Sequence, residues 1–147
     1  MKVIALKGEK DSGKSTTLKE VYKILKAAGG TTENYNCDDW LERTFKEFRD
    51  VIHFADKKIG IVLKGHGDVV TENSLINQLI ILKNQGCDIA ICACTTGKNI
   101  EATIINNFPE NKFIDKKKSK DESLQQIENT HKARCIIDLL SDFLNAM

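Results

Sequence analysis

A glycine-bounded loop that contains a lysine and a hydroxyl residue stands near the start of the chain, in the segment GEKDSGKS from Gly8 to Ser15. Its two glycines allow the backbone to turn tightly, so that successive N–H groups point into one concavity. A helical pattern follows the loop, and the positive end of that helix would face the same concavity. The segment therefore predicts a binding site for phosphate groups.

The side chains of this loop predict how the phosphates are held. Lys14 is expected to reach the β- and γ-phosphates, Ser15 to place its hydroxyl on Mg²⁺, and Thr16 to bond near the α-phosphate. Asp11 is unusual in such a loop, because its carboxylate must point away from the phosphates or cap the backbone. The predicted ligand is ATP or another nucleoside triphosphate with Mg²⁺, and the predicted contact residues are Gly8, Glu9, Lys10, Asp11, Ser12, Gly13, Lys14, Ser15 and Thr16.

Three short apolar segments are expected to form the strands that position the loop. They are apolar on both faces, as central parallel strands are, and each precedes a turn signal and a helical pattern. This alternation predicts an α/β fold of three layers, with helices on both faces of a mainly parallel sheet. The strand segments are residues 3–6, 59–63 and 89–94, and the helical patterns cover residues 15–28, 71–85 and 97–107.

Other segments extend this sheet and its helices. Residues 48–64 predict two strands around a turn at Asp56-Lys57, which would add one antiparallel strand. Residues 112–115 predict a further short strand. The segment SKDE, which begins at Ser119, matches a capping box and is expected to open a long carboxy-terminal helix.

The spacing Gly8-x-x-x-x-Gly13-Lys14-Ser15, between a buried strand and a helix, resembles the phosphate loop of the P-loop nucleoside triphosphate hydrolases. In size and motif order the chain is most similar to the small nucleoside and nucleotide kinases of that superfamily. The resemblance implies a P-loop fold over residues 1–147 and phosphoryl transfer from ATP or another nucleoside triphosphate. It also implies an acidic residue that holds Mg²⁺ at the end of another central strand.

Asp68 and Asp39 are the carboxylates to which the resemblance points. Asp68 lies five residues beyond Leu63 instead of directly after the strand, and it is expected to bind Mg²⁺ and to act in catalysis. The alternative for Asp68 is a turn or helix-capping role. Asp39 is similar to the base that activates an acceptor hydroxyl in some small-metabolite kinases. The competing interpretation, which the polar segment before it favours, is that Asp38 caps a short helix.

Two classes of function fit these residues. The first is a small Mg²⁺-dependent phosphotransferase that acts on a nucleoside, a nucleotide or another small metabolite. The second is a nucleotide-binding regulatory or accessory ATPase that signals to a protein partner, with little or no kinase activity. The chain has only three arginines, fewer than phosphoryl transfer in nucleotide kinases usually recruits. The lysines that could replace them as point charges are Lys10, Lys98 and Lys116 to Lys118. The run from Asp115 to Lys120 could close over a nucleotide as a basic lid, and the alternative is a solvated connector.

Composition limits the remaining possibilities. A chain of 147 residues fits a single domain, and 22 basic residues against 21 acidic ones give no indication of a nucleic acid or an anionic membrane as partner. No apolar segment is long enough to span a bilayer, and no secretory signal is seen, so a cytoplasmic location is expected. Five cysteines, an odd number, are expected to be reduced thiols, most of them buried in strand segments.

Overall fold

The computed structural model of the protein describes residues 1–10, 12–33, 49–63, 74–96 and 99–146. These residues form six strands and four helices, which confirms the α/β class predicted from the sequence. In chain order the elements are β1 (Lys2–Gly8), α1 (Lys14–Ala27), β2 (Thr31–Thr32), β3 (Arg49–Phe54), β4 (Lys57–Val62), α3 (Leu75–Asn84), β5 (Ile89–Thr95), α4 (Ile100–Asn107), β6 (Asn111–Lys116) and α5 (Glu122–Asn145).

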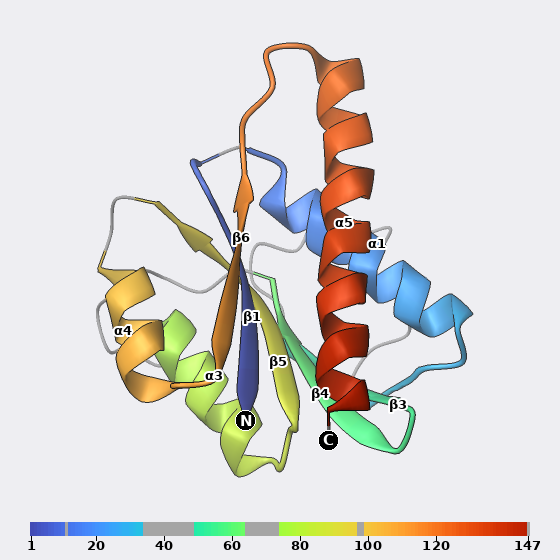
Figure 1. Cartoon of the computed structure of the whole chain (residues 1–147), viewed down its shortest axis with the longest axis vertical. Helices are drawn as coiled ribbons and strands as arrows, with labels where there is room; N and C mark the ends of the chain where they lie inside the picture. The colour runs from blue at the N-terminus through green and yellow to red at the C-terminus, as the bar shows by residue number, and fades with distance from the viewer. Residues whose placement is uncertain (11, 34–48, 64–73, 97–98, 147) are drawn as a thin grey trace.

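The strands form one mixed sheet in the order β2-β3-β4-β5-β1-β6. Strands β4, β5, β1 and β6 are parallel, whereas β3 is antiparallel to β4 and β2 is antiparallel to β3. The four parallel strands therefore end at the same edge of the sheet. The glycine-bounded loop leaves β1 at that edge, next to the ends of β5 and β6 (Figure 1).

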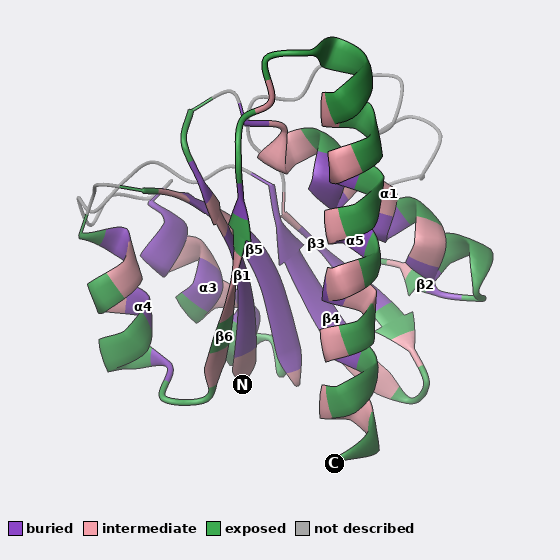
Figure 2. Ribbon diagram, turned by 45° about the horizontal axis from the view of Figure 1, so that its top comes forward, coloured by how far each residue is buried: buried purple, intermediate pink, exposed green. Residues whose placement is uncertain are grey.

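Helices cover both faces of the sheet (Figure 1). On one face, α1 and α5 pack over a core that includes Leu18 and Ile136, and on the other face α3 and α4 pack over a core that includes Leu79 and Ile104. The central strands are buried on both faces as a result (Figure 2). This burial explains why their sequences are apolar throughout instead of alternating with polar residues.

The hairpin predicted in residues 48–64 is present as β3 and β4, but its turn lies one residue earlier than expected. Ala55 and Asp56 form the turn, with φ angles of 52° and 62°, while Lys57 already pairs with Phe54 in the sheet. Two positive φ angles in a two-residue loop are typical of the type I′ turn, whose twist matches that of the flanking strands. The antiparallel addition to the sheet is therefore confirmed.

The helix starts differ from the predictions by a few residues. Ser74 is the N-cap of α3 and Asn99 that of α4, so the second and third predicted helices start too early. The capping box at Ser119 is wrong, because Asp121 is the N-cap of α5 and its carboxylate accepts hydrogen bonds from the backbone of the first turn. Asp121 and Ser119 are both good capping residues, and the sequence alone did not separate them.

Candidate functional site

The glycine-bounded loop lies where the sheet offers a crevice for a ligand. The chain leaves β1 toward α1 on one face of the sheet and leaves β5 toward α4 on the opposite face (Figure 1). Since β1 and β5 are neighbours, their following segments diverge at the carboxyl edge. Ligands in open α/β sheets bind at such a divergence, outside the carboxyl ends of the strands. The backbone of Thr96, just after β5, donates to the Gly8 carbonyl at 3.1 Å and so joins the two segments.

Two glycines give the loop its shape. Gly13 is the N-cap of α1 and has a φ angle of 90°, in the left-handed region that glycine adopts without strain. Gly8 ends β1, where a Cβ atom would overlap the Lys116 carbonyl and would lie only 2.7 Å from the Ser12 hydroxyl. Between the two glycines, the backbone of Ser12 donates to the Glu9 carbonyl at 3.2 Å and closes the turn. The glycines predicted from the sequence therefore have a steric reason to be there.

The side chain of Lys14 lies across the loop that precedes it. Its ammonium donates to the Gly8 carbonyl at 2.8 Å and to the Glu9 carbonyl at 2.6 Å. Lys14 is the first residue of α1, so its charge lies beside the positive end of that helix. The first turn of α1 carries no acidic residue, and the helix end therefore retains its attraction for an anion.

The hydroxyl residues at the start of α1 have different environments. Ser15 is half-buried and Thr16 is exposed, whereas Thr17 is fully buried. The Thr17 hydroxyl donates to the Gly13 carbonyl at 2.8 Å, which stabilises the first turn of the helix. Ser15 and Thr16 are thus the hydroxyl residues of this turn that reach solvent, and their predicted contacts with a ligand remain predictions.

Two buried polar residues from distant elements lie beneath the loop. The sequence suggested Lys116 only as one of several lysines that could face the phosphates, and it gave no indication of Asn129. Lys116, at the end of β6, is only 2% exposed, and its ammonium donates to the Ser12 carbonyl at 2.7 Å. Asn129, on α5, lies against Gly13, and its Oδ1 atom has no hydrogen-bond partner among the described residues. The run from Asp115 to Lys120 is therefore not solvated throughout, because Lys116 is buried under the loop.

Several candidates from the sequence lie outside the described residues. They include the loop residue Asp11 and the catalytic and metal candidates Asp39 and Asp68, and their predicted roles remain predictions. Glu9 and Lys10 are described, and both are exposed. Across the described ranges, no group of three or more His, Cys, Asp or Glu residues could hold a metal ion.

An ion cluster lies beside the loop, on the face of the sheet that α4 covers. The Lys7 ammonium lies 3.2 Å from a carboxylate oxygen of Glu101 and 3.4 Å from one of Asp115. The hydrogen bond to Glu101 raises the pKa of Lys7, with a smaller contribution from the charge of Asp115. The two carboxylates are therefore already engaged by a cation, and the cluster joins β1, β6 and α4 instead of presenting a free acidic group.

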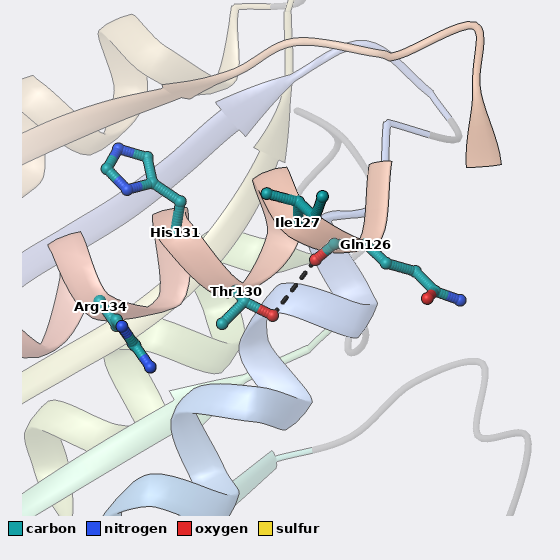
Figure 3. Close-up of a pocket in the computed structure, with 5 residues that line it drawn as sticks. All are labelled: Gln126, Ile127, Thr130, His131 and Arg134. Atoms are coloured by element: carbon teal, nitrogen blue, oxygen red, sulfur yellow. Dashed lines mark hydrogen bonds between the residues drawn. The ribbon is translucent and has the colours of Figure 1, made fainter. Parts of the chain in front are cut away.

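A shallow hollow of about 390 Å³ lies on α5, apart from the loop (Figure 3). Ile127 is 66% exposed there, and the Thr130 hydroxyl is satisfied by the Gln126 carbonyl at 3.2 Å. No loop residue lines this hollow among the parts of the chain that the structure describes. The described lining residues are Gln126, Ile127, Thr130, His131 and Arg134.

None of the helices seen in the described segments has the length and apolar character needed to cross a membrane. Comparisons of the chain with protein-family models, with curated proteins and with solved structures gave no match. The case for a function therefore depends on the residues and the geometry of the loop.

Proposed function

We propose that the protein binds a nucleoside triphosphate with Mg²⁺ at the loop from Gly8 to Ser15, and that it transfers the γ-phosphoryl group to a nucleoside, a nucleotide or another small metabolite. On this proposal the fold is that of a P-loop nucleoside triphosphatase. The observation that carries the proposal is the position of Lys14 over the loop, at the positive end of α1 and at the divergence of β1 and β5.

Lys14 supplies the first part of the binding chemistry. Its ammonium donates to two backbone carbonyls of the loop. A phosphate oxygen is a stronger partner than a neutral carbonyl, because both members of the new hydrogen bond are charged. Lys14 would therefore exchange a carbonyl for the β- and γ-phosphates, while the backbone N–H groups of the loop bond the remaining oxygens.

The hydroxyl of Ser15 fits a magnesium ion in its chemistry. Mg²⁺ prefers oxygen ligands and in phosphate sites is held by one or two protein groups, by water and by the phosphates themselves. Ser15 is half-buried at the first turn of α1 and supplies one such oxygen. On the sequence alone, we assign Asp68 as the second protein ligand of Mg²⁺ and Asp39 as the base that activates the acceptor hydroxyl. The ion would neutralise charge on the transferred phosphoryl group.

A specific observation favours the regulatory ATPase as a second candidate. Arg49 donates to the Gln78 side chain on α3 at 2.5 Å, and Arg134 lies on the exposed side of α5. Neither of these two arginines has a hydrogen bond or an ion pair with a described residue of the loop, and the third arginine, Arg43, lies outside the described residues. Arginines that contact the transferred phosphoryl group accelerate phosphoryl transfer strongly, and their absence from a site favours slow turnover.

Calorimetric titration with Mg²⁺ and ATP, GTP or ADP tests the binding proposal. The variant Lys14→Ala removes a charged hydrogen-bond donor and is expected to weaken binding by roughly 10- to 150-fold. Lys23→Ala, at an exposed position further along α1, is the matched control and should bind as the wild type does. If the wild type bound none of these nucleotides, the proposal would be wrong.

A second experiment separates phosphoryl transfer from regulation. ADP production is measured with Mg·ATP alone and with a panel of nucleosides, nucleotides and small hydroxyl metabolites. A phosphotransferase releases ADP rapidly only when the correct acceptor is present, and transfer is confirmed by the mass of the phosphorylated acceptor. Slow release that no acceptor accelerates would instead support the regulatory ATPase.

A further inference from the structure

Lys116 combines deep burial with a position directly behind the phosphate loop. It is the last residue of β6 and pairs with Gly8, the last residue of β1, at the carboxyl edge of the sheet. Its side chain is among the largest fully buried ones, although lysine is rarely buried in proteins. A lysine at this place therefore requires a physical explanation.

The hydrogen-bond partners of Lys116 are neutral. Its ammonium donates to the Ser12 carbonyl at 2.7 Å and to the Lys117 carbonyl at 3.1 Å. Glu128 attracts the charge and Lys132 repels it, and within the described ranges no carboxylate forms an ion pair with it. Burial lowers the pKa of Lys116 below its ordinary value. Burial of this charge beside neutral partners costs stability, and an anion in the loop would offset that cost.

The bond from Lys116 also fixes the direction of a backbone N–H group. The peptide bond between Ser12 and Gly13 is trans and planar, so its carbonyl and its N–H point in opposite directions. The carbonyl of Ser12 points to Lys116, beneath the loop. The N–H of Gly13 must therefore point away from Lys116, and the structure assigns it no partner within the described residues.

The side chain of Ser12 does not set this orientation itself. Ser12 is fully buried, and its hydroxyl has no hydrogen-bond partner in the described part of the chain. Two bonds of its backbone hold it instead, one from its N–H to the Glu9 carbonyl at 3.2 Å and one from Lys116 to its own carbonyl. The bond from Lys116 is the one that connects this peptide to a different element of the fold.

We propose that Lys116 is a positioning residue of the phosphate site: it turns the Ser12–Gly13 peptide so that the Gly13 N–H faces the bound anion, and it places a second positive charge behind the loop. This inference depends on the proposed nucleotide binding and adds a residue that the loop motif does not contain. The ligand it serves is a polyphosphate, since the contribution of Lys116 concerns the phosphates and not the nucleoside.

Two substitutions at Lys116 test the proposal with Mg·ATP and with inorganic pyrophosphate as probes. Lys116→Met removes both the donor and the charge, and Lys116→Gln keeps a donor for the Ser12 carbonyl without the charge. The Lys116→Met substitution is expected to weaken binding of both probes by about tenfold or more, and Lys116→Gln is expected to weaken it less. Lys112→Met, at an exposed position on the same strand, is the control and should stay within twofold of the wild type.

Thermal unfolding of the same variants separates positioning from a merely structural role. The Lys116→Met variant loses a buried charge that lacks an ion-pair partner. Its melting temperature without ligand should therefore be at least that of the Lys116→Gln variant, although Lys116→Met binds phosphate more weakly. If affinity instead followed melting temperature across the variants, or if a folded Met variant bound within twofold of the wild type, the inference would be wrong. If the wild type itself bound neither probe, the proposed function would fail as well.

A measurement on the wild type covers the case in which neither variant folds. The amide resonance of Gly13 in a ¹⁵N–¹H spectrum is expected to shift when pyrophosphate is added, because its N–H faces the anion. The exposed glycine Gly29, at the end of α1, serves as the internal reference and should not shift. A saturated pyrophosphate complex in which the Gly13 resonance is unchanged would overturn the inference.

Discussion

The side-chain amide of Asn129, on α5, lies directly against the Cα atom of Gly13, so that a Cβ atom on residue 13 would overlap the Oδ1 atom. Position 13 is therefore restricted twice, by its positive φ angle and by the lack of space. The contact also joins the phosphate loop to the last helix of the chain. A shift of the loop would therefore displace the atoms of α5 that pack against it, since packed atoms leave little room for independent movement.

Alanine substitutions at two glycines should show this double restriction. Gly13 and Gly29 both have positive φ angles, of 90° and 103°, but a Cβ atom at Gly29 would meet nothing within 4 Å. Gly29→Ala should therefore cost only the backbone strain of about 1–2 kcal/mol. Gly13→Ala should add a steric cost of roughly 1–3 kcal/mol. Urea denaturation of both variants measures the difference in the free energy of unfolding.

A double variant identifies the source of the additional cost at position 13. Asn129→Ala removes the amide that a Cβ atom would meet, so Gly13→Ala should be less costly in that background and approach the value for Gly29→Ala. An unchanged cost in the Asn129→Ala background would show that the strain comes from the backbone or from another neighbour.

The signals that predicted the fold and the loop are local in sequence. The strands were recognised because residues buried on both faces of a sheet must be apolar, and the core on each face of β1 bears this out. The loop was recognised because the turn and the start of a helix need glycine at fixed positions. Gly13 is where that need is strictest, with a positive φ angle and no space for a side chain.

The burial of Lys116 and Asn129 beneath the loop could not be predicted, because it arises from contacts between distant segments. Lys116 and Ser12 are 104 positions apart, and nothing near Lys116 in sequence distinguishes it from its exposed neighbour Lys117. Asn129 reads as an ordinary polar residue of a helix until α5 is placed against the loop. The error at the start of α5 has a different cause, since Ser119 and Asp121 are equally good caps and only the backbone geometry separates them.

The revised cap of α5 predicts unequal effects of two alanine substitutions. The Asp121 carboxylate accepts from the backbone N–H groups of Ser123, at 2.8 Å, and Leu124, at 3.3 Å. Asp121→Ala should therefore lower the free energy of unfolding by about 1 kcal/mol. Ser119→Ala removes two long, exposed bonds of its hydroxyl, one donated to the Asp121 carbonyl at 3.2 Å and one accepted from the Asp121 N–H at 3.4 Å, and should cost less than half as much. A larger loss at Ser119 in urea denaturation would restore the original capping box.

The cysteines of the core should resist alkylation. Burial raises the pKa of Cys87 and of Cys94 to about 11, and it raises the pKa of Cys92 well above its ordinary value. At pH 8 only about one in a thousand of the Cys87 or Cys94 thiols is a reactive thiolate. Among the four cysteines that the structure describes, Cys135, which is half-buried on α5, should therefore react with iodoacetamide first. Peptide mass spectrometry over time gives the rate for each cysteine, and faster labelling at Cys94 would contradict its burial.

The raised pKa of Cys94 also predicts how stability responds to alkaline pH. Below its ordinary value of 9.0 the thiol keeps its proton in both the folded and the unfolded chain, so it has no effect on stability. Between pH 9 and about 11 the unfolded chain releases this proton first, and the folded state loses stability as the pH rises. Cys94→Ala removes this dependence at the cost of a small cavity. The free energy of unfolding of the wild type should therefore fall relative to that of Cys94→Ala between pH 8 and pH 10.5, by on the order of 1–2 kcal/mol. A constant difference between the two proteins at both pH values would show that the Cys94 thiol ionises equally readily in the folded and unfolded chains.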